Sequence, residues 1–355
     1  MQRCIKLAER GLGKTFPNPL VGSVIVYEGN IIGEGWHKKA GSPHAEANAI
    51  SNVHNKEFLS KSTLYVSLEP CNHFGKTPPC TTAIINSKIS EVVYSIKDID
   101  KRVHGKTKNI LSLKKIKVKN GLLDNKIKKF YSSYFYNRKN KLPYITGKIA
   151  VSKNNLIYSK LNKKITNSLS DKLTHFLRYK NDSIMISYKT LNKDNPRLDC
   201  RLKKLKKFSP KRIILDNKLN LNTKSYLFRT ADQENTIVFY NEAEKSRIAI
   251  FRKNNINLVK SNINQDKKFD ITMIMKKLYK IGCRNILIEG GNDLTNHLIK
   301  KKLFNQFYLF KCAKKLSKLA EYKEFNGLKI LEQKYKKKNK LRSNFGKDTV
   351  ILHVN

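Results

Sequence analysis

The sequence predicts an α/β protein built from two domains. Short apolar runs of strand length alternate with amphipathic stretches of helix length, and this alternation is typical of layered α/β sheets. The polar, basic segment 137–142 interrupts the pattern, which restarts after Pro143. At about 100–200 residues per domain, a chain of 355 residues has room for two domains. We expect one domain over residues 1–140 and another over residues 141–355.

The first domain is expected to begin with a helix and a hairpin. Two apolar runs flank a turn and therefore predict the hairpin. Prolines stand near the start of two later helices, where a missing backbone N–H costs little. In chain order the predicted elements are the helix 1–10, the hairpin strands 21–26 and 31–35, the helix 44–54, the strand 64–68, the helix 77–86 and the strand 91–96.

The second domain repeats the alternation without repeating the sequence. Its clearest strands are the apolar runs 144–150, 182–187, 212–216 and 285–288, the last of which leads into Gly290 and Gly291. Near the C-terminus the basic run 334–340 is expected to form a solvated loop.

The charge balance raises the hypothesis of nucleic-acid binding. Lysine and arginine number 73 against 27 aspartate and glutamate residues, a net charge of +46. The lysines are spread over nearly every segment together with asparagine and isoleucine, which indicates a solvated surface shaped by an A+T-rich coding bias. We therefore expect no nucleic-acid partner, although a phosphorylated substrate can profit from the positive field.

Membrane insertion and disulfide formation are not expected. No apolar run approaches the roughly 18–20 residues that span a bilayer, and the N-terminus lacks the apolar centre of a signal peptide. Six cysteines in 355 residues are too few for a disulfide framework, and two of them stand in a metal-ligand context. A reducing cytoplasm fits this composition.

Four residues near the ends of predicted elements carry the chemistry of the first domain. His44 and Glu46 begin a helix as His-Ala-Glu, Cys71 follows the strand 64–68, and Cys80 begins the next helix. One nitrogen and two sulfur ligands suit Zn²⁺ and leave a fourth position for a water whose pKa the metal lowers toward about 7. Glu46 is expected to carry the proton from that water to the leaving amine. This combination is the signature of zinc deaminases.

Each part of this pattern has an ordinary alternative. A single His-x-Glu is common by chance, and free cysteines are usually buried as small apolar residues. The joint occurrence of His-Ala-Glu, Glu-Pro-Cys and Pro-Pro-Cys at element ends is what predicts a zinc site. The N-terminus of a helix is also expected to favour the thiolate of Cys80.

The spacing of the two cysteines narrows the class of deaminase. Eight residues separate Cys71 from Cys80, where many base and nucleoside deaminases have two. The segment Glu-Pro-Cys-Asn-His-Phe-Gly-Lys-Thr-Pro-Pro-Cys resembles the bifunctional riboflavin-biosynthesis deaminase–reductase family, as do residues 18–22 and 40–46. Asp98, Val103 and Gly105 fill the positions of that family's Asp-Pro-x-x-x-Val-x-Gly segment.

The resemblance implies a substrate and its contacts. The first domain would have a cytidine-deaminase-like three-layer α/β/α fold and would deaminate 2,5-diamino-6-(5-phosphoribosylamino)pyrimidin-4(3H)-one. Asn18 would contact the pyrimidine ring. His73, Lys76 and Thr77 lie on the insert, where they would meet the ribose-phosphate. Lysine is so frequent in this chain that a merely solvated Lys76 is an equally good interpretation.

The second domain resembles the same family's reductase, which has a dihydrofolate-reductase-like fold and uses NADPH to reduce the ribose to a ribityl chain. Leu177-Arg178, the loop from Thr190 to Arg201 and the segment 288–291 match its motifs. Two arginines can bind a phosphate, and paired glycines before a helix can admit a dinucleotide phosphate. The implied substrate contacts are Arg178, Leu198, Arg201 and Glu289. The implied cofactor contacts are Ala150, Lys164, Thr190, Asp194, Asn217, Gly290 and Gly291.

Several positions depart from the family pattern. Asn154 and Asn155 replace an Asp-Gly turn, Lys164 replaces a tryptophan expected near the cofactor, and an acidic pair is absent near 305–306. Because asparagine tolerates positive φ, we expect the turn to persist. These departures lead to the hypothesis that the reductase is retained but weakened. Two alternatives stay open: a deaminase whose second domain is only a scaffold, and a nucleic-acid base deaminase. A homo-oligomer is also possible.

Overall fold

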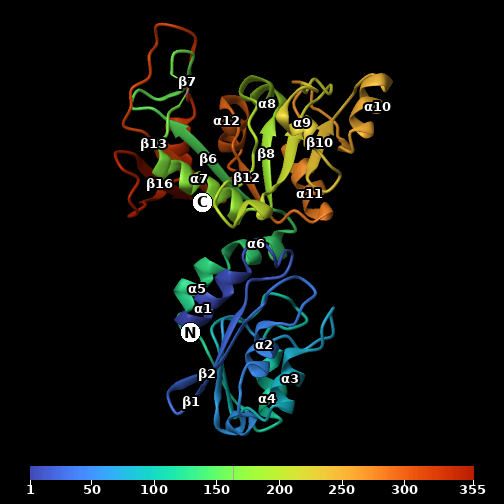
Figure 1. The fold of residues 1–355 in the computed structure, drawn as a ribbon, viewed down its shortest axis with the longest axis vertical. Coiled ribbons are helices and arrows are strands. Elements are labelled where there is room, and N and C mark those ends of the chain that lie inside the picture. The colour runs from blue at the N-terminus through green and yellow to red at the C-terminus, as the bar shows by residue number, and fades with distance from the viewer. Residues whose placement is uncertain (163) are drawn as a thin grey trace. The chain divides into compact units, whose positions relative to one another are not determined.

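The chain forms two compact units, residues 1–141 and residues 142–355, each with its own sheet and core (Figure 1). The computed structural model describes residues 1–162 and 164–355. Most of the polar segment that the sequence predicts between the domains is helical, because α6 (Ser132–Asn140) continues through it. Within the described residues, no helix has both the length and the apolar character needed to cross a bilayer.

The first unit is a five-stranded sheet in the order β2-β1-β3-β4-β5. The predicted hairpin is confirmed, and its first strand pairs antiparallel with β3, while β3, β4 and β5 run parallel. The last strand was not predicted, since three of its four side chains are polar or charged exposed groups. The bounds are β1 Gly22–Tyr27, β2 Asn30–Trp36, β3 Thr63–Val66, β4 Glu91–Tyr94 and β5 Lys117–Asn120.

Helices cover both faces of this sheet and make three layers (Figure 1). Because side chains alternate along a strand, Val24 packs into a cluster with α1, whereas Ile25 packs into the cluster that α2, α3 and α4 complete. The helices of the unit are α1 Gln2–Ala8, α2 Ala45–Ser51, α3 Cys80–Asn86, α4 Lys106–Ser112, α5 Asp124–Phe130 and α6.

The predicted start of the helix 77–86 is wrong by three residues. α3 begins at Cys80, and Pro79 before it is extended, with φ −60° and ψ 137°. Thr77 and Pro78 each precede a proline, which disfavours the helical conformation for them. The delay makes Cys80 the first helical residue, and it leaves Thr77 on the preceding loop.

The second unit is a nine-stranded sheet in the order β11-β10-β9-β8-β12-β6-β13-β16-β15. The strands from β11 to β13 run parallel, and β16 and β15 extend the sheet antiparallel. The bounds are β6 Tyr144–Val151, β8 Ser183–Ser187, β9 Lys211–Leu215, β10 Thr236–Tyr240, β11 Asn257–Lys260, β12 Asn285–Ile288, β13 Gln306–Lys311, β15 Lys337–Lys340 and β16 Thr349–Val354. β7 (Leu156–Ser159) and β14 (Tyr322–Glu324) form a separate pair.

Both faces of this sheet are buried by helices, as parallel sheets require. Met185 belongs to one core cluster, and its neighbours Ile184 and Ile186 belong to the other. The helices are α7 Ser168–Lys180, α8 Tyr188–Asp194, α9 Tyr226–Arg229, α10 Lys245–Lys253, α11 Ile271–Ile281, α12 Asn292–Lys300 and α13 Leu328–Lys334.

The basic run 334–340 is not the predicted loop. Its last four residues form β15, an edge strand whose side chains are all exposed. A strand whose side chains are all exposed does not need apolar residues, so its composition did not indicate a strand. Lysines on an edge strand oppose pairing with another chain.

Candidate functional site

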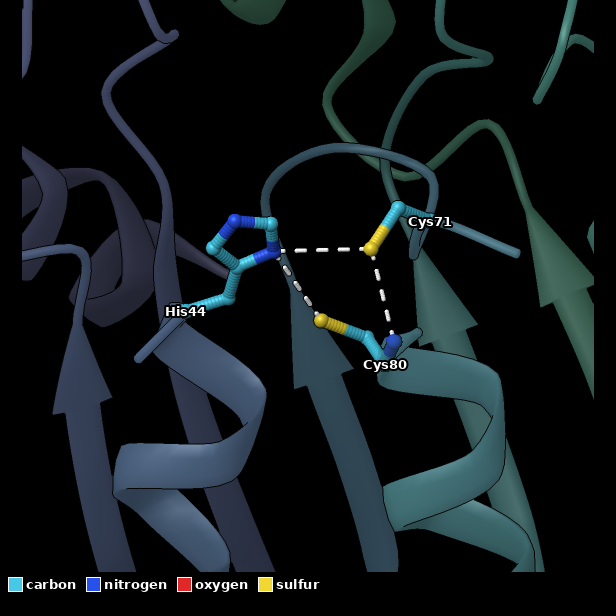
Figure 2. A group of neighbouring side chains, drawn as sticks. All are labelled: His44, Cys71 and Cys80. Carbon is cyan, nitrogen blue, oxygen red and sulfur yellow. Dashed lines mark hydrogen bonds between the residues drawn. The ribbon is translucent and has the colours of Figure 1, made fainter. Parts of the chain in front are cut away.

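Three predicted metal ligands meet in the first unit, although they come from three separate segments (Figure 2). His44 is the extended residue that caps α2, Cys71 follows β3, and Cys80 begins α3. The Nδ1 atom of His44 lies 3.3 Å from the Sγ of Cys80 and 3.4 Å from the Sγ of Cys71. The backbone N–H of Cys80 donates to the Sγ of Cys71 at 3.3 Å.

This donor set fits zinc. Tetrahedral bonds of about 2.0–2.1 Å to nitrogen and about 2.3 Å to sulfur place the ligand atoms about 3.5–3.8 Å apart. The three ligand atoms all lie within 4.8 Å of one another, and the two distances from His44 Nδ1 are close to that expectation. Two sulfurs and one imidazole leave the fourth position for a small molecule.

The hydrogen bonds in this cluster favour the thiolate of Cys71, whereas the sequence pointed to that of Cys80. Hydrogen bonds from the Cys80 thiol, from His44 and from the Cys80 backbone lower the pKa of Cys71. The same shared proton, together with burial, raises the pKa of Cys80. The N-terminus of α3 therefore favours the thiolate of Cys71, because the backbone N–H of Cys80 points at the Cys71 sulfur. A cation that binds both sulfurs must displace the remaining proton.

Glu46 lies in the first turn of α2, two residues after His44, with only 3% of its surface exposed. Burial raises the pKa of Glu46 to about 7, against the opposing charge of His44. A carboxyl group that titrates near neutrality can both accept and return a proton. The structure thus gives this residue the property that a proton carrier needs.

A cavity of about 260 Å³ connects these residues with the other predicted contacts of the first domain. Residues from the loop before β1, from the insert after Cys71 and from the segment after β4 share its walls. The polar residues of these walls include Asn18, His37, His44, Glu46, Glu69, Cys71, His73, Lys76, Thr77, Asp98 and Tyr134.

Asn18 is oriented by a histidine that the sequence reasoning missed. His37 is 2% exposed, and burial lowers its pKa, so its ring is neutral. Its Nδ1 lies 3.3 Å from the carbonyl oxygen of Pro43, and its Nε2 lies 3.2 Å from the Nδ2 of Asn18. The Asn18 amide therefore donates to His37, which leaves its carbonyl oxygen to accept from a ligand. A lone histidine with no motif around it gave no signal of this role.

Glu69 holds in place the cavity wall that is formed by the segment after β4. Its carboxylate accepts the backbone N–H groups of Asp98, Gly105 and Thr107 at 3.1, 3.0 and 3.2 Å. One buried side chain thus holds the whole segment that follows β4. Tyr134 donates to Asp98 at 3.1 Å, which joins α6 to the same wall. The Glu-Pro-Cys motif contained Glu69, but its partners lie about thirty residues further along the chain.

The insert between Cys71 and Cys80 places three predicted substrate contacts in different surroundings. His73 is half-buried, and its Nδ1 is buried with no hydrogen-bond partner among the described residues. Lys76 is exposed at the cavity wall. Thr77 turns inward, where its Oγ1 lies 3.3 Å from the Nε2 of His44.

The predicted residues of the second unit gather at the carboxyl ends of its parallel strands. Ala150 lies on β6, Thr190 follows β8, Asn217 follows β9, and Glu289 follows β12. The carboxyl ends of parallel strands lie at one edge of the sheet, where open α/β sheets bind ligands.

Two of the predicted substrate contacts bind each other. Arg178 donates from Nε and Nη2 to the two carboxylate oxygens of Glu289 at 2.8 and 2.9 Å. Although burial opposes it, the Arg178 charge lowers the pKa of Glu289. The Nε and Nη2 atoms of the Arg178 guanidinium are therefore both occupied by Glu289. Its Nη1 donates to the carbonyl of Asp199 at 3.1 Å.

Arg201 keeps an exposed guanidinium beside this pair. Its Nε lies 3.3 Å from the Nε2 of His175, whose Nδ1 lies 3.2 Å from the same Asp199 carbonyl. Burial and two neighbouring arginine charges lower the pKa of His175, so a neutral ring accepts from Arg201 and donates to the carbonyl. Glu289, Arg178, His175 and Arg201 form one connected network.

Lys148 is a further polar residue of this site that the sequence reasoning missed. It lies on β6 with its Nζ 5.0 Å from the ring centroid of Phe310, and burial lowers its pKa while the Glu289 charge opposes the shift. In the sequence it is one of many lysines. Only the fold distinguishes it, by placing its half-buried side chain near the charges of Glu289 and Arg178.

Thr190 and Gly291 lie close together at the start of α12, directly after Gly290. A Cβ atom on Gly291 would lie 3.0 Å from Thr190 Oγ1, and one on Gly290 would lie 3.2 Å from Leu294. Gly291 caps α12, and no side chain caps that helix. The first-turn N–H groups and the Thr190 hydroxyl thus fit a dinucleotide phosphate. Asp194 lies one turn beyond Thr190 on α8.

Three other residues that the sequence predicts as substrate or cofactor contacts have side chains that contact other parts of the protein. Leu198 has φ 57°, and its side chain is buried in the core, so only its backbone is available. Asn217 donates from Nδ2 to the carbonyl of Lys267 at 2.7 Å. Lys164, 63% exposed, pairs with Asp171 at 2.7 Å.

The departures from the family pattern have local partners. Asn155 adopts φ 61°, so the predicted turn persists. Asn154 bonds through both amide atoms to the backbone of Leu316, at 3.0 and 2.9 Å. Asn305 accepts from Ile145 at 2.7 Å, and Gln306 donates to the hydroxyl of Thr146 at 3.0 Å. These substitutions hold strands and turns together.

Comparison with family models matches both units. Residues 1–96 match the cytidine and deoxycytidylate deaminase zinc-binding region, and residues 149–338 match the RibD C-terminal domain. The zinc-binding match contains His44, Glu46, Cys71 and Cys80.

Comparison with individual proteins extends over the full chain. The riboflavin biosynthesis protein RibD of Aquifex aeolicus is 32% identical over 99% of this chain and 96% of its own length. That of Actinobacillus pleuropneumoniae is 32% identical over 100% and 94%. The structure of Acinetobacter baumannii RibD matches with a TM-score of 0.83 at 26% identity, over 99% of this chain and 97% of that one. A Thermotoga maritima diaminohydroxyphosphoribosylaminopyrimidine deaminase/5-amino-6-(5-phosphoribosylamino)uracil reductase matches with 0.82 at 28% identity, over 100% and 97%.

Proposed function

This chain belongs to the family of riboflavin-biosynthesis RibD proteins, and we propose that it deaminates 2,5-diamino-6-(5-phosphoribosylamino)pyrimidin-4(3H)-one and then reduces the ribose of the product. It is a bifunctional enzyme, a zinc hydrolase with a cytidine-deaminase-like domain and an NADPH-dependent oxidoreductase with a dihydrofolate-reductase-like domain. The alternative of a deaminase with a scaffold domain is not favoured. The substrate rests on the name of the Thermotoga maritima relative.

The observation that carries the deaminase assignment is the cluster of His44, Cys71 and Cys80 beside a cavity that Glu46 also lines. Zinc held by the first three would supply an activated water as the nucleophile. Glu46 takes a proton as the ring carbon is attacked and returns it to the departing amine nitrogen. Because the carboxyl is buried, no bulk water competes for that proton.

The remaining cavity residues orient the substrate. The Asn18 carbonyl oxygen, fixed by His37, accepts from a ring N–H. The buried Nδ1 of His73 meets a polar group of the ribose, and Lys76 lies where a phosphate reaches the cavity wall. The wall that Glu69 holds keeps this arrangement closed on the other side.

The second unit performs the reduction at the carboxyl edge of its sheet. NADPH supplies the hydride. The Gly290–Gly291 turn and Thr190 hold a cofactor phosphate at the start of α12. Arg201, steadied by His175, binds the substrate phosphate, while Arg178 orients Glu289 toward the sugar. Lys148, a half-buried lysine on β6 whose charge interacts with Glu289 and Arg178, donates a proton to the sugar oxygen as the ring opens.

Replacing Lys148 by methionine is expected to lower NADPH oxidation by about 10²–10⁴-fold, since the apolar stem is kept and only the proton donor is lost. Ammonia release stays at the wild-type rate. The exposed Lys153, on the turn after β6, gives the matched control Lys153→Met. Steady-state rates with the deaminated substrate test this. A Lys148→Met variant that oxidises NADPH at the wild-type rate would remove the residue from catalysis.

Removal of zinc is expected to separate the two activities. All three ligands lie in residues 1–141, whereas the network around Glu289 lies in residues 142–355. After dialysis against a strong chelator, ammonia release should cease, and NADPH oxidation with supplied deaminated substrate should continue. Zinc added back should restore the first activity. Loss of both activities on chelation would show that the second site also needs the metal.

Two further sequence predictions become part of this proposal. All six cysteines are free thiols, which supports a reducing compartment such as the cytoplasm. A homo-oligomer is proposed from the sequence alone, and sedimentation of the purified protein measures it.

A further inference from the structure

The imidazole of His44 is held at both nitrogens. Its Nδ1 faces the two cysteine sulfurs, and its Nε2 lies 3.3 Å from the hydroxyl oxygen of Thr77. The edge of His37 packs against the ring at a centroid distance of 5.1 Å and an angle of 82°. Thr77 is half-buried on the insert, and its backbone carbonyl accepts the N–H of Gly75 at 3.2 Å.

The protonation of a neutral imidazole decides which atom donates in the contact between His44 and Thr77. A neutral imidazole carries one proton, so a ring that offers Nδ1 to a cation must carry that proton on Nε2. The Nε2–H group then needs an acceptor, because it is partly withdrawn from water. The Thr77 hydroxyl oxygen is the acceptor that the structure provides. A partner of this kind selects the tautomer and fixes the plane of the ring.

We propose that Thr77 is a positioning residue of the zinc centre, which holds His44 in the Nδ1-binding tautomer by accepting its Nε2–H. The proposal rests on the proposed zinc site. It changes the expectation that Thr77 meets the ribose-phosphate, because the side chain turns inward to the metal ligand. The insert thereby has two functions: His73 and Lys76 line the cavity without touching the metal ligands, whereas the Thr77 hydroxyl, at the same cavity, holds the ring of His44.

Three variants test the proposal. Thr77→Val keeps the shape and removes the acceptor, Thr77→Ser keeps the acceptor, and Thr82→Val makes the same change at an exposed position of α3. Zinc affinity of the full chain is measured by competition with a chromophoric chelator. We expect Thr77→Val to weaken zinc binding about 10–100-fold, as is usual for such a partner. Thr77→Ser and Thr82→Val should bind zinc as the wild type does.

A second readout reports the tautomer directly. In zinc-loaded wild type and Thr77→Ser, the nitrogen spectrum of His44 should show a slowly exchanging proton on Nε2. In Thr77→Val that proton should exchange faster. Thermal unfolding of each variant shows whether the fold of the first unit is kept, since a global loss of structure would lower the midpoint as well as the zinc affinity.

The outcomes separate this proposal from the zinc assignment itself. Wild-type affinity in Thr77→Val overturns the role of Thr77 and leaves the zinc centre intact. A raised KM with unchanged zinc affinity also overturns it, in favour of a substrate contact. A wild-type chain that binds no zinc overturns both, because there would be no centre to brace.

Discussion

Replacing Glu46 by glutamine is expected to lower ammonia release by about 10²–10⁴-fold while the protein still binds one zinc ion. Glutamine matches the size of the buried side chain, but it cannot take up and return a proton. The three metal ligands are untouched. A steady-state assay of ammonia release and a measurement of bound zinc on the same sample test this expectation.

The result is specific if two controls hold. Glu57→Gln, at an exposed position of the same unit, should deaminate at the wild-type rate. The Glu46→Gln variant should still oxidise NADPH when the deaminated substrate is supplied. Unchanged ammonia release in Glu46→Gln would assign proton transfer to another group.

Replacing Cys80 by serine is expected to abolish both zinc binding and deamination. A serine hydroxyl does not ionise near neutral pH, so the site loses one of its two anionic ligands. The lost side chain is 2% exposed, and it stands at the centre of the ligand cluster. Metal content of the purified variant and its ammonia release give the result.

Cys4→Ser is the matched control, because Cys4 is equally buried in the same unit, lies outside the ligand cluster, and donates from Sγ to the carbonyl of Tyr65 at 3.4 Å. A serine hydroxyl can make the same bond, so zinc content should be unchanged. If Cys80→Ser keeps its zinc, the third ligand is not Cys80.

Local sequence patterns predicted the metal ligands and eight of the sixteen strands that the described residues form. Apolar runs such as 21–26 and 285–288 sit within a residue or two of β1 and β12, because burial of both faces demands continuous apolar residues. The four zinc-site residues were predictable because each belongs to a short motif. The start of α3 was misjudged because prolines at 78 and 79 were assigned to the helix when they precede it.

Long-range pairing was not predictable from one sequence. The sequence predicted that Arg178 would bind a substrate phosphate, whereas in the structure its fork binds Glu289, 111 residues away. Lys148 had no motif to separate it from the other lysines. His37 and His175 are isolated histidines whose roles as orienting partners depend on side chains that only the fold brings near.

The dependence on partners that only the fold brings near also applies to the positions that depart from the family pattern. Asn154, Asn155 and Lys164 suggested a weakened reductase, because they replace family residues near the cofactor. The structure shows that each has a structural partner or a tolerated backbone conformation. A position that departs from its family pattern can still make local contacts of its own, as the amide of Asn154 does with Leu316.

The central claim is that one chain carries both activities, and a coupled assay on zinc-loaded protein tests it most directly. The substrate is the phosphoribosylated diaminopyrimidine, given with and without NADPH, and ammonia and NADPH are followed together. We expect ammonia release in both reactions and one NADPH oxidised per ammonia when the cofactor is present. Ammonia release without any NADPH oxidation would contradict the account of the second unit, and absence of ammonia with zinc bound would contradict that of the first.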